Sequence, residues 1–139
     1  MTNDEIGTVL LNIGNLLQIQ GEDSFRARIY ERAADAIDDL TVDLGQLAEK
    51  GTLQSIPGIG KAIEEKVIEM LEMGRCHFYD NLMEEMGDEV LDLLAIRGVG
   101  VKTAARFYNE LDVKSLWDLR AAIDGSKFKD LKGIGSKTI

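Results

Sequence analysis

Three short stretches place two glycines directly ahead of a predicted helix, with a lysine close behind. They are IPGIGKAIEEK (residues 56–66), IRGVGVKTAAR (residues 96–106) and LKGIGSKTI (residues 131–139). A first glycine permits a turn with positive φ, and a second lets a ligand approach the backbone closely. The N–H groups that open the following helix carry partial positive charge, so such a turn suits a phosphate group. The paired glycines are Gly58 and Gly60, Gly98 and Gly100, and Gly133 and Gly135, and the lysines are Lys61, Lys102 and Lys137.

Glycine-rich turns of this kind also occur in nucleotide-binding proteins, but there in a different sequence context. A dinucleotide-binding turn needs a third glycine and a preceding strand, and a P-loop needs a longer spacing before its Gly-Lys pair. Ile63 or Thr103 stands where the third glycine would be, and the flanking segments are helical in pattern. The glycines could also be mere helix ends and packing points. Three copies with the same aliphatic spacing favour the helix-hairpin-helix motif, which grips a DNA strand by its phosphates without reading bases.

The overall charge of the chain opposes nucleic acid at long range. The formal net charge of its 139 residues is −9, whereas phosphate backbones attract basic surfaces. Backbone N–H groups act at contact distance, and acidic charges elsewhere are screened beyond about 8–10 Å at physiological salt. We therefore expect local, modest and salt-sensitive binding. The alternative from another functional class is an acidic helical bundle that binds a basic protein, which predicts no salt-dependent affinity for DNA.

Apolar residues recur at helical spacing, and no stretch alternates as a strand would. We predict an all-α bundle of short helices with two complete helix-hairpin-helix motifs and the start of a third. Its two parts are expected to be residues 1–86 and 87–139, divided near Gly87. The predicted helices run from Thr2 or Asn3 to Gly21, from Ser24 to Leu40, from Asp43 to Lys50, from the first glycine turn to Gly74, from His77 to Met86, from Asp88 to Leu94, from about Val101 to Leu111, and from Ser115 to Ile123.

Composition and helical periodicity also give expectations for burial, location and metal binding. Trp117 and Phe128 are expected in the core rather than stacked on bases. One cysteine excludes an internal disulfide, and no apolar run reaches the roughly 20 residues of a membrane span, so a cytoplasmic protein is expected. We also expect a monomer, although the sequence carries no signal for the oligomeric state. Cys76 and His77 are too few for a zinc site. The second helix should bury a stripe made of Phe25, Ile29, Ala33, Ala36, Ile37 and Leu40.

Four runs in this order resemble the N-terminal region of family X DNA polymerases, most closely the bacterial and archaeal members. They are GEDSFRARIYERAADAI (residues 21–37), IPGIGKAIEEKVIEMLEMGR (residues 56–75), IRGVGVKTAARFYNEL (residues 96–111) and SLWDLRAAI (residues 115–123). The resemblance implies a lyase-like domain in residues 1–86 and, in residues 87–139, a subdomain that grips the primer side of gapped DNA in base excision repair. It stops before the palm subdomain, so polymerase activity and its Mg²⁺ are not expected from this chain alone.

The resemblance also implies a possible activity, removal of a 5′-deoxyribose phosphate through a lysine Schiff base. The position of the family's lysine is Lys66, and Tyr30 matches a tyrosine beside the lyase pocket. Ala62 stands where active members often carry a second lysine, and Glu69 lies one turn on. Two alternatives therefore stay open: Lys66 is the nucleophile, or it is an ordinary solvated lysine in a module that only binds DNA.

The remaining expectations concern phosphates and a monovalent cation. Arg26 matches a basic residue that meets the 5′-phosphate in the family, and Arg28 and Arg32 extend that basic face. The candidate DNA contacts are Arg26, Arg28, Gly58, Gly60, Lys61, Gly98, Gly100, Lys102 and Arg106. The family's hairpins hold Na⁺ or K⁺ through backbone carbonyls, which here would be those of Gln54, Ile56 and Ile59 and of Leu94, Ile96 and Val99.

Overall fold

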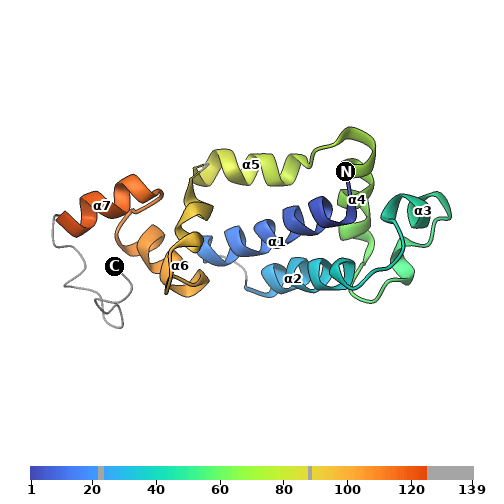
Figure 1. The fold of residues 1–139 in the computed structure, drawn as a ribbon, viewed down its shortest axis with the longest axis horizontal. Coiled ribbons are helices and arrows are strands. Elements are labelled where there is room, and N and C mark those ends of the chain that lie inside the picture. The colour runs from blue at the N-terminus through green and yellow to red at the C-terminus, as the bar shows by residue number, and fades with distance from the viewer. Residues whose placement is uncertain (22–23, 88, 125–139) are drawn as a thin grey trace.

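The computed structural model describes residues 1–21, 24–87 and 89–124, and within these ranges it contains helices and no strand, which confirms the all-α prediction (Figure 1). The third glycine turn and Phe128 lie outside the described residues. In chain order the elements are α1 (Asn3–Gln20), α2 (Ser24–Asp38), α3 (Leu44–Glu49), the 3₁₀ turn η1 (Leu53–Ser55), α4 (Lys61–Met73), α5 (His77–Met86), the 3₁₀ turn η2 (Val90–Ala95), α6 (Val101–Glu110) and α7 (Leu116–Asp124).

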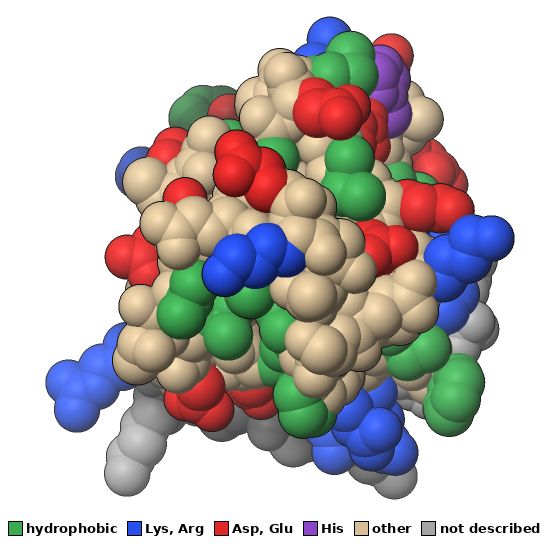
Figure 2. All heavy atoms as spheres, turned by 90° about the vertical axis from the view of Figure 1, so that its right-hand side faces the viewer, with side chains coloured by type: hydrophobic (Ala, Val, Ile, Leu, Met, Phe, Trp, Pro, Cys, Tyr) green, Lys and Arg blue, Asp and Glu red, His purple; other side chains and the backbone are tan. Residues whose placement is uncertain are grey.

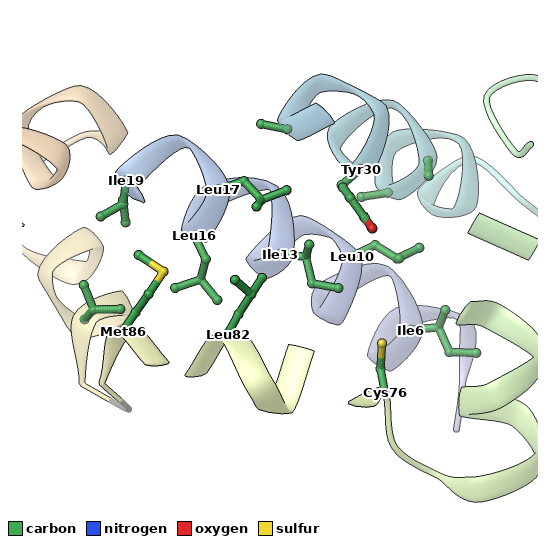
Figure 3. Close-up of a cluster of buried hydrophobic side chains, with 14 of the residues drawn as sticks. Ile6, Leu10, Ile13, Leu16, Leu17, Ile19, Tyr30, Cys76, Leu82 and Met86 are labelled. Atoms are coloured by element: carbon green, nitrogen blue, oxygen red, sulfur yellow. The ribbon is translucent and has the colours of Figure 1, made fainter. Parts of the chain in front are cut away.

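Helix α1 is the central element of the bundle, and it begins where the sequence predicts. Thr2 caps it in a reciprocal capping box with Glu5, which satisfies backbone donors at its start. Its apolar side lies between α2 and α5, where Figure 3 shows Tyr30 on one side and Leu82 and Met86 on the other. The side chains of α1 that are wholly buried are Ile6, Leu10, Ile13, Leu16 and Ile19.

Helices α1 and α2 approach closely, and this corrects the buried stripe predicted for α2. A Cβ atom on Gly14 of α1 would lie 3.1 Å from the Ala27 carbonyl oxygen, so the contact requires small residues. Phe25 and Ile29 are 74% and 37% exposed, because α2 turns Ala27 and Tyr30 toward Gly14 of α1 instead. Of the predicted stripe, Ala33 and Ile37 are buried and Ala36 and Leu40 are half-buried. The buried residues of α2 are Ala27, Tyr30, Ala33, Ala34 and Ile37.

The two ends of α1 are tied to different parts of the chain. At its start, the Asn3 side chain donates to the Val42 carbonyl (2.9 Å) and accepts from the Leu44 N–H (2.9 Å), which anchors α3. At its other end, the Asn109 side chain of α6 donates to the Ile19 carbonyl at 2.7 Å. Figure 1 shows α4 by the N-terminus and α6 at the opposite end of α1.

The helix expected from Asp88 to Leu94 is present as the 3₁₀ helix η2 (Val90–Ala95), which is followed at once by the second glycine turn. One further prediction, a buried Trp117, is wrong. Trp117 is 77% exposed rather than buried, although Ser115 caps its helix as predicted by accepting from the Asp118 N–H. No helix in the described ranges has the length and apolar character needed to cross a membrane.

Candidate nucleic-acid interface

The first glycine turn (residues 56–60) and the second (residues 96–100) have almost the same backbone conformation. Gly58 has φ of 94° and Gly98 has φ of 87°, the left-handed region that favours glycine. Gly60 and Gly100, which precede α4 and α6, have φ of −92° and −94° with ψ of −174° and −177°. Two segments 40 residues apart therefore build one local geometry.

Equivalent hydrogen bonds hold each turn closed. The Ile56 carbonyl accepts from the Ile59 N–H at 3.1 Å, and the Ile96 carbonyl accepts from the Val99 N–H at 3.0 Å. The start of α4 or α6 has no side-chain cap, in contrast to α1 with Thr2. The first N–H groups of these two helices are thus available to an acidic ligand.

The first glycine of a turn serves the fold, and the second leaves space for a ligand. A Cβ atom on Gly58 would lie 3.4 Å from the Arg32 carbonyl oxygen, in a conformation that side chains rarely adopt. This glycine lets the turn close against α2. A Cβ atom on Gly60 or Gly100 would have nothing within 4 Å, and the φ of both is ordinary. Neither of these second glycines is required by the fold, and both leave open space where a phosphate could approach.

The predicted cations differ in what they contact. Lys61 is the first residue of α4, and Lys102 is the second residue of α6. Both are exposed, beside the open side of the turn that precedes their helix. Arg28 is also exposed, on α2. Arg106 is half-buried, and its Nε donates to Glu110 at 3.2 Å, so part of its charge is already paired on its own helix.

Lys66 lies over two aromatic rings near the first turn. Its Nζ is 5.0 Å from the centroid of the Phe78 ring and 5.7 Å from that of the Tyr30 ring. The rings are stacked, with centroids 5.9 Å apart and planes inclined by 7°. The Cζ of Arg26 lies 5.1 Å from the Phe78 centroid. The structure thus brings Lys66, Tyr30 and Arg26 together at distances typical of cation–π contacts.

Three helices position this cluster. Tyr30 comes from the buried side of α2 and points toward α1 in Figure 3. Lys66 stands on α4, and Phe78 is the second residue of α5. The connection between α4 and α5 is fixed by Glu69, whose carboxylate accepts from the His77 backbone N–H at 3.0 Å and from its ring. These hydrogen bonds, the one from the ring first, lower the pKa of the Glu69 carboxyl.

A family model described as a helix-hairpin-helix domain matches residues 1–76, more than half of the chain. The chain belongs to this helix-hairpin-helix family. A second model, described as a SAM-like helix-hairpin-helix tandem, matches residues 90–139. The two described glycine turns are therefore the hairpins of this helix-hairpin-helix protein, and one falls within each match.

Two relatives support the same conclusion. The chain is 28% identical over 138 residues to the DNA polymerase/3′-5′ exonuclease PolX of Bacillus subtilis, which covers 99% of the chain and 24% of that protein. It is 35% identical over 103 residues to DNA polymerase lambda of Rattus norvegicus, which covers 73% of the chain and 17% of that protein. The helix-hairpin-helix chain thus spans about a quarter or less of these relatives, and its resemblance to the N-terminal region of family X DNA polymerases is confirmed.

The charge of the helix-hairpin-helix protein is mixed on the face seen from the α3 end. Figure 2 shows acidic and basic side chains interspersed there rather than one continuous acidic surface. The net charge of −9 is thus compatible with local basic sites on this face. On α2, Arg26, Arg28 and Arg32 precede Asp35 and Asp38, and Glu31 interrupts the basic run.

Phe78 is the residue of this cluster that the sequence did not single out. It stands among charged residues in IEMLEMGRCHFYDNL (residues 68–82), and the resemblance assigned nothing to it. The one signal was its rarity, because only 6% of the chain is aromatic. Its ring shows its relation to Lys66 only once the order of α2, α4 and α5 in space is known.

Cys76 is expected to react slowly with thiol reagents in the folded protein. It is 2% exposed and points toward α1 in Figure 3, and burial raises the pKa of its thiol, which lowers the thiolate fraction at pH 8. Labelling with a chromogenic disulfide should be about 100-fold slower in native buffer than in denaturant. Full labelling on mixing in native buffer would contradict the buried position.

Proposed function

We propose that this chain binds DNA through the phosphates of one strand at each glycine turn, without reading bases. The observation that supports this most directly is the repetition of one open, lysine-flanked turn at two places in the fold. The helix-hairpin-helix matches and the two polymerase relatives support DNA as the partner. The alternative function, an acidic helical bundle that binds a basic protein, would not require such a pair of turns.

We further propose gapped or nicked DNA as the substrate class, in the repair of DNA. The two turns lie at opposite ends of α1, and a discontinuous duplex bends more easily to meet two separated contacts. In this proposal the chain acts as a monomer, since one copy carries both turns. A cytoplasmic location stays a prediction.

The affinity for gapped DNA is expected to fall steeply with salt. Neutralising about three phosphates gives a slope of log K against log salt near −3, and Lys61→Ala or Lys102→Ala should each reduce that slope by about one. Fluorescence anisotropy of labelled gapped duplex between about 50 and 200 mM salt measures it. Unlabelled gapped, nicked and intact duplexes, used as competitors, test the preference. A slope of zero would favour the protein-binding alternative.

A second function, lyase chemistry, is supported by the position of Lys66 over Tyr30 and Phe78 with Arg26 beside them. In this proposal the neutral amine of Lys66 attacks C1′ of the ring-opened sugar, and loss of water gives an imine. A base removes a C2′ proton, the C3′–O bond breaks, and DNA with a 5′-phosphate leaves. Water then hydrolyses the imine and restores the amine.

A monovalent cation is proposed at each turn. The donor set would be neutral carbonyl oxygens of Gln54, Ile56 and Ile59, and of Leu94, Ile96 and Val99, which suits the hard ions Na⁺ and K⁺. The Ile56 and Ile96 carbonyls already accept one hydrogen bond each within the turn, and a carbonyl oxygen has two lone pairs. When bound, the cation would supply positive charge beside a DNA phosphate.

A further inference from the structure

The ring of Phe78 is the common neighbour of the two cations in the Lys66 cluster. The Cζ of Arg26 lies 5.1 Å and the Nζ of Lys66 5.0 Å from its centroid, and these residues come from different helices. Tyr30 stacks against Phe78 and extends the aromatic surface beneath Lys66. Removing the Phe78 ring would therefore change the surroundings of both cations at once.

The backbone next to Phe78 is held by hydrogen bonds in which neither cation takes part. The carboxylate of Glu69, one turn beyond Lys66 on α4, accepts hydrogen bonds from the backbone and the ring of His77, the residue before Phe78. This clamp fixes the first turn of α5 to the helix that carries Lys66. Since Phe78 is only half-buried, its ring is part of the surface of the cluster rather than of the deep core.

We propose that Phe78 is a positioning residue that holds the Lys66 amine and the Arg26 guanidinium over one ring face or edge, so that both meet the same sugar-phosphate end of a DNA strand. A flexible lysine has several rotamers, and a cation–π contact favours those over the ring. The inference rests on the proposed lyase for its chemical consequence, but the placement of the two cations is a property of the free protein.

The test compares Phe78→Leu, which keeps an apolar side chain, with Phe78→Tyr, which keeps the ring. Tyr79→Leu is the matched control, because Tyr79 is the next residue of α5, is also half-buried, and contacts Asn12 (3.2 Å) rather than Lys66. In the free protein, NMR measures the ring-current shift of the Lys66 Hε protons, assigned with Lys66→Arg. With DNA, borohydride trapping at saturating protein measures the rate of imine formation.

The expected result has three parts. Phe78→Leu reduces the upfield shift of the Lys66 Hε protons, slows trapping at saturation by about 10-fold, and weakens the preference for a 5′-phosphate over a 5′-hydroxyl end by about 3-fold. Phe78→Tyr keeps the Lys66 shift, the trapping rate and the end preference at native values. Tyr79→Leu changes none of these three quantities, even if it lowers the melting temperature.

The remaining outcomes separate the two proposals. If Phe78→Leu leaves the Lys66 shift unchanged, or if trapping and end preference persist at native values, Phe78 does not position these cations. If the native protein forms no adduct, the lyase proposal fails, and the NMR shift together with the end preference still decides the role of Phe78. If Tyr79→Leu reproduces the effects of Phe78→Leu, general packing of α5 is responsible and the inference is wrong.

Discussion

Replacing Gly60 or Gly100 by alanine is expected to remove most of the DNA affinity while the fold stays intact. A methyl group at either position meets no protein atom within 4 Å, and the φ of both residues suits any amino acid. The same methyl group would stand where a phosphate must approach the helix N–H groups. Each substitution should weaken binding by at least about 10-fold, or about 1.4 kcal/mol, and the double substitution should weaken it further.

Stability and binding have to be measured side by side. Alanine is a poorer residue than glycine at a helix N-cap, by about 0.5–1 kcal/mol, so the melting temperature should fall by no more than a few degrees. Gly74→Ala is the opposite control: its φ of 72° makes alanine unfavourable by about 1 kcal/mol, at the far end of α4 from the turn. It should lower the melting temperature and leave the affinity of the folded protein unchanged. Native affinity in the Gly60 and Gly100 variants would mean that DNA does not contact the turns.

Replacing Lys66 is expected to abolish covalent trapping on DNA that carries an incised abasic site. With borohydride, the native protein should give a stable adduct, and Lys66→Ala should give none above background. Lys66→Arg is the sharper variant, because the guanidinium keeps the positive charge over Tyr30 and Phe78 but has no nucleophilic amine. It should bind DNA within about 3-fold of the native protein and form no adduct.

Lys61→Ala serves as the control for this experiment. Lys61 stands on the same helix, is exposed, and contributes charge at the turn. Its loss should weaken binding and leave the adduct yield at saturation unchanged. An adduct that survives in Lys66→Ala would place the nucleophile elsewhere. A native protein that binds DNA with salt-dependent affinity but forms no adduct would be a binding module without chemistry.

The order of the helices could be predicted from sequence because their ends carry local signals. Thr2 with Glu5, Gly21 and Ser115 each mark an end by backbone conformation or by capping. The side of α2 that is buried could not be predicted in this way. Hydrophobicity pointed to Phe25 and Ile29, whereas α2 turns Ala27 and Tyr30 toward Gly14 of α1, and that close approach depends on the whole bundle.

In the candidate site too, local features could be predicted from sequence and contacts between helices could not. The glycine turns are local and repeated, so their geometry was visible in the spacing of Gly58, Gly60, Gly98 and Gly100. The role of Phe78 depends on three helices meeting, and its neighbours Arg26 and Lys66 are 52 and 12 residues away in sequence. Residue patterns within one helix carry no information on such contacts.

The length of α1 sets how much DNA the two glycine turns can contact together. Its 18 residues give a helix about 27 Å long, with one glycine turn toward each end. Each strand of a duplex advances about 3.4 Å along the helix axis per nucleotide, so a span as long as α1 corresponds to about eight nucleotides along that axis. When both turns bind one molecule, the second contact forms at a high effective concentration, and the two weak affinities combine into avidity. A fragment too short to reach from one turn to the other gains none of this advantage, whatever its base sequence.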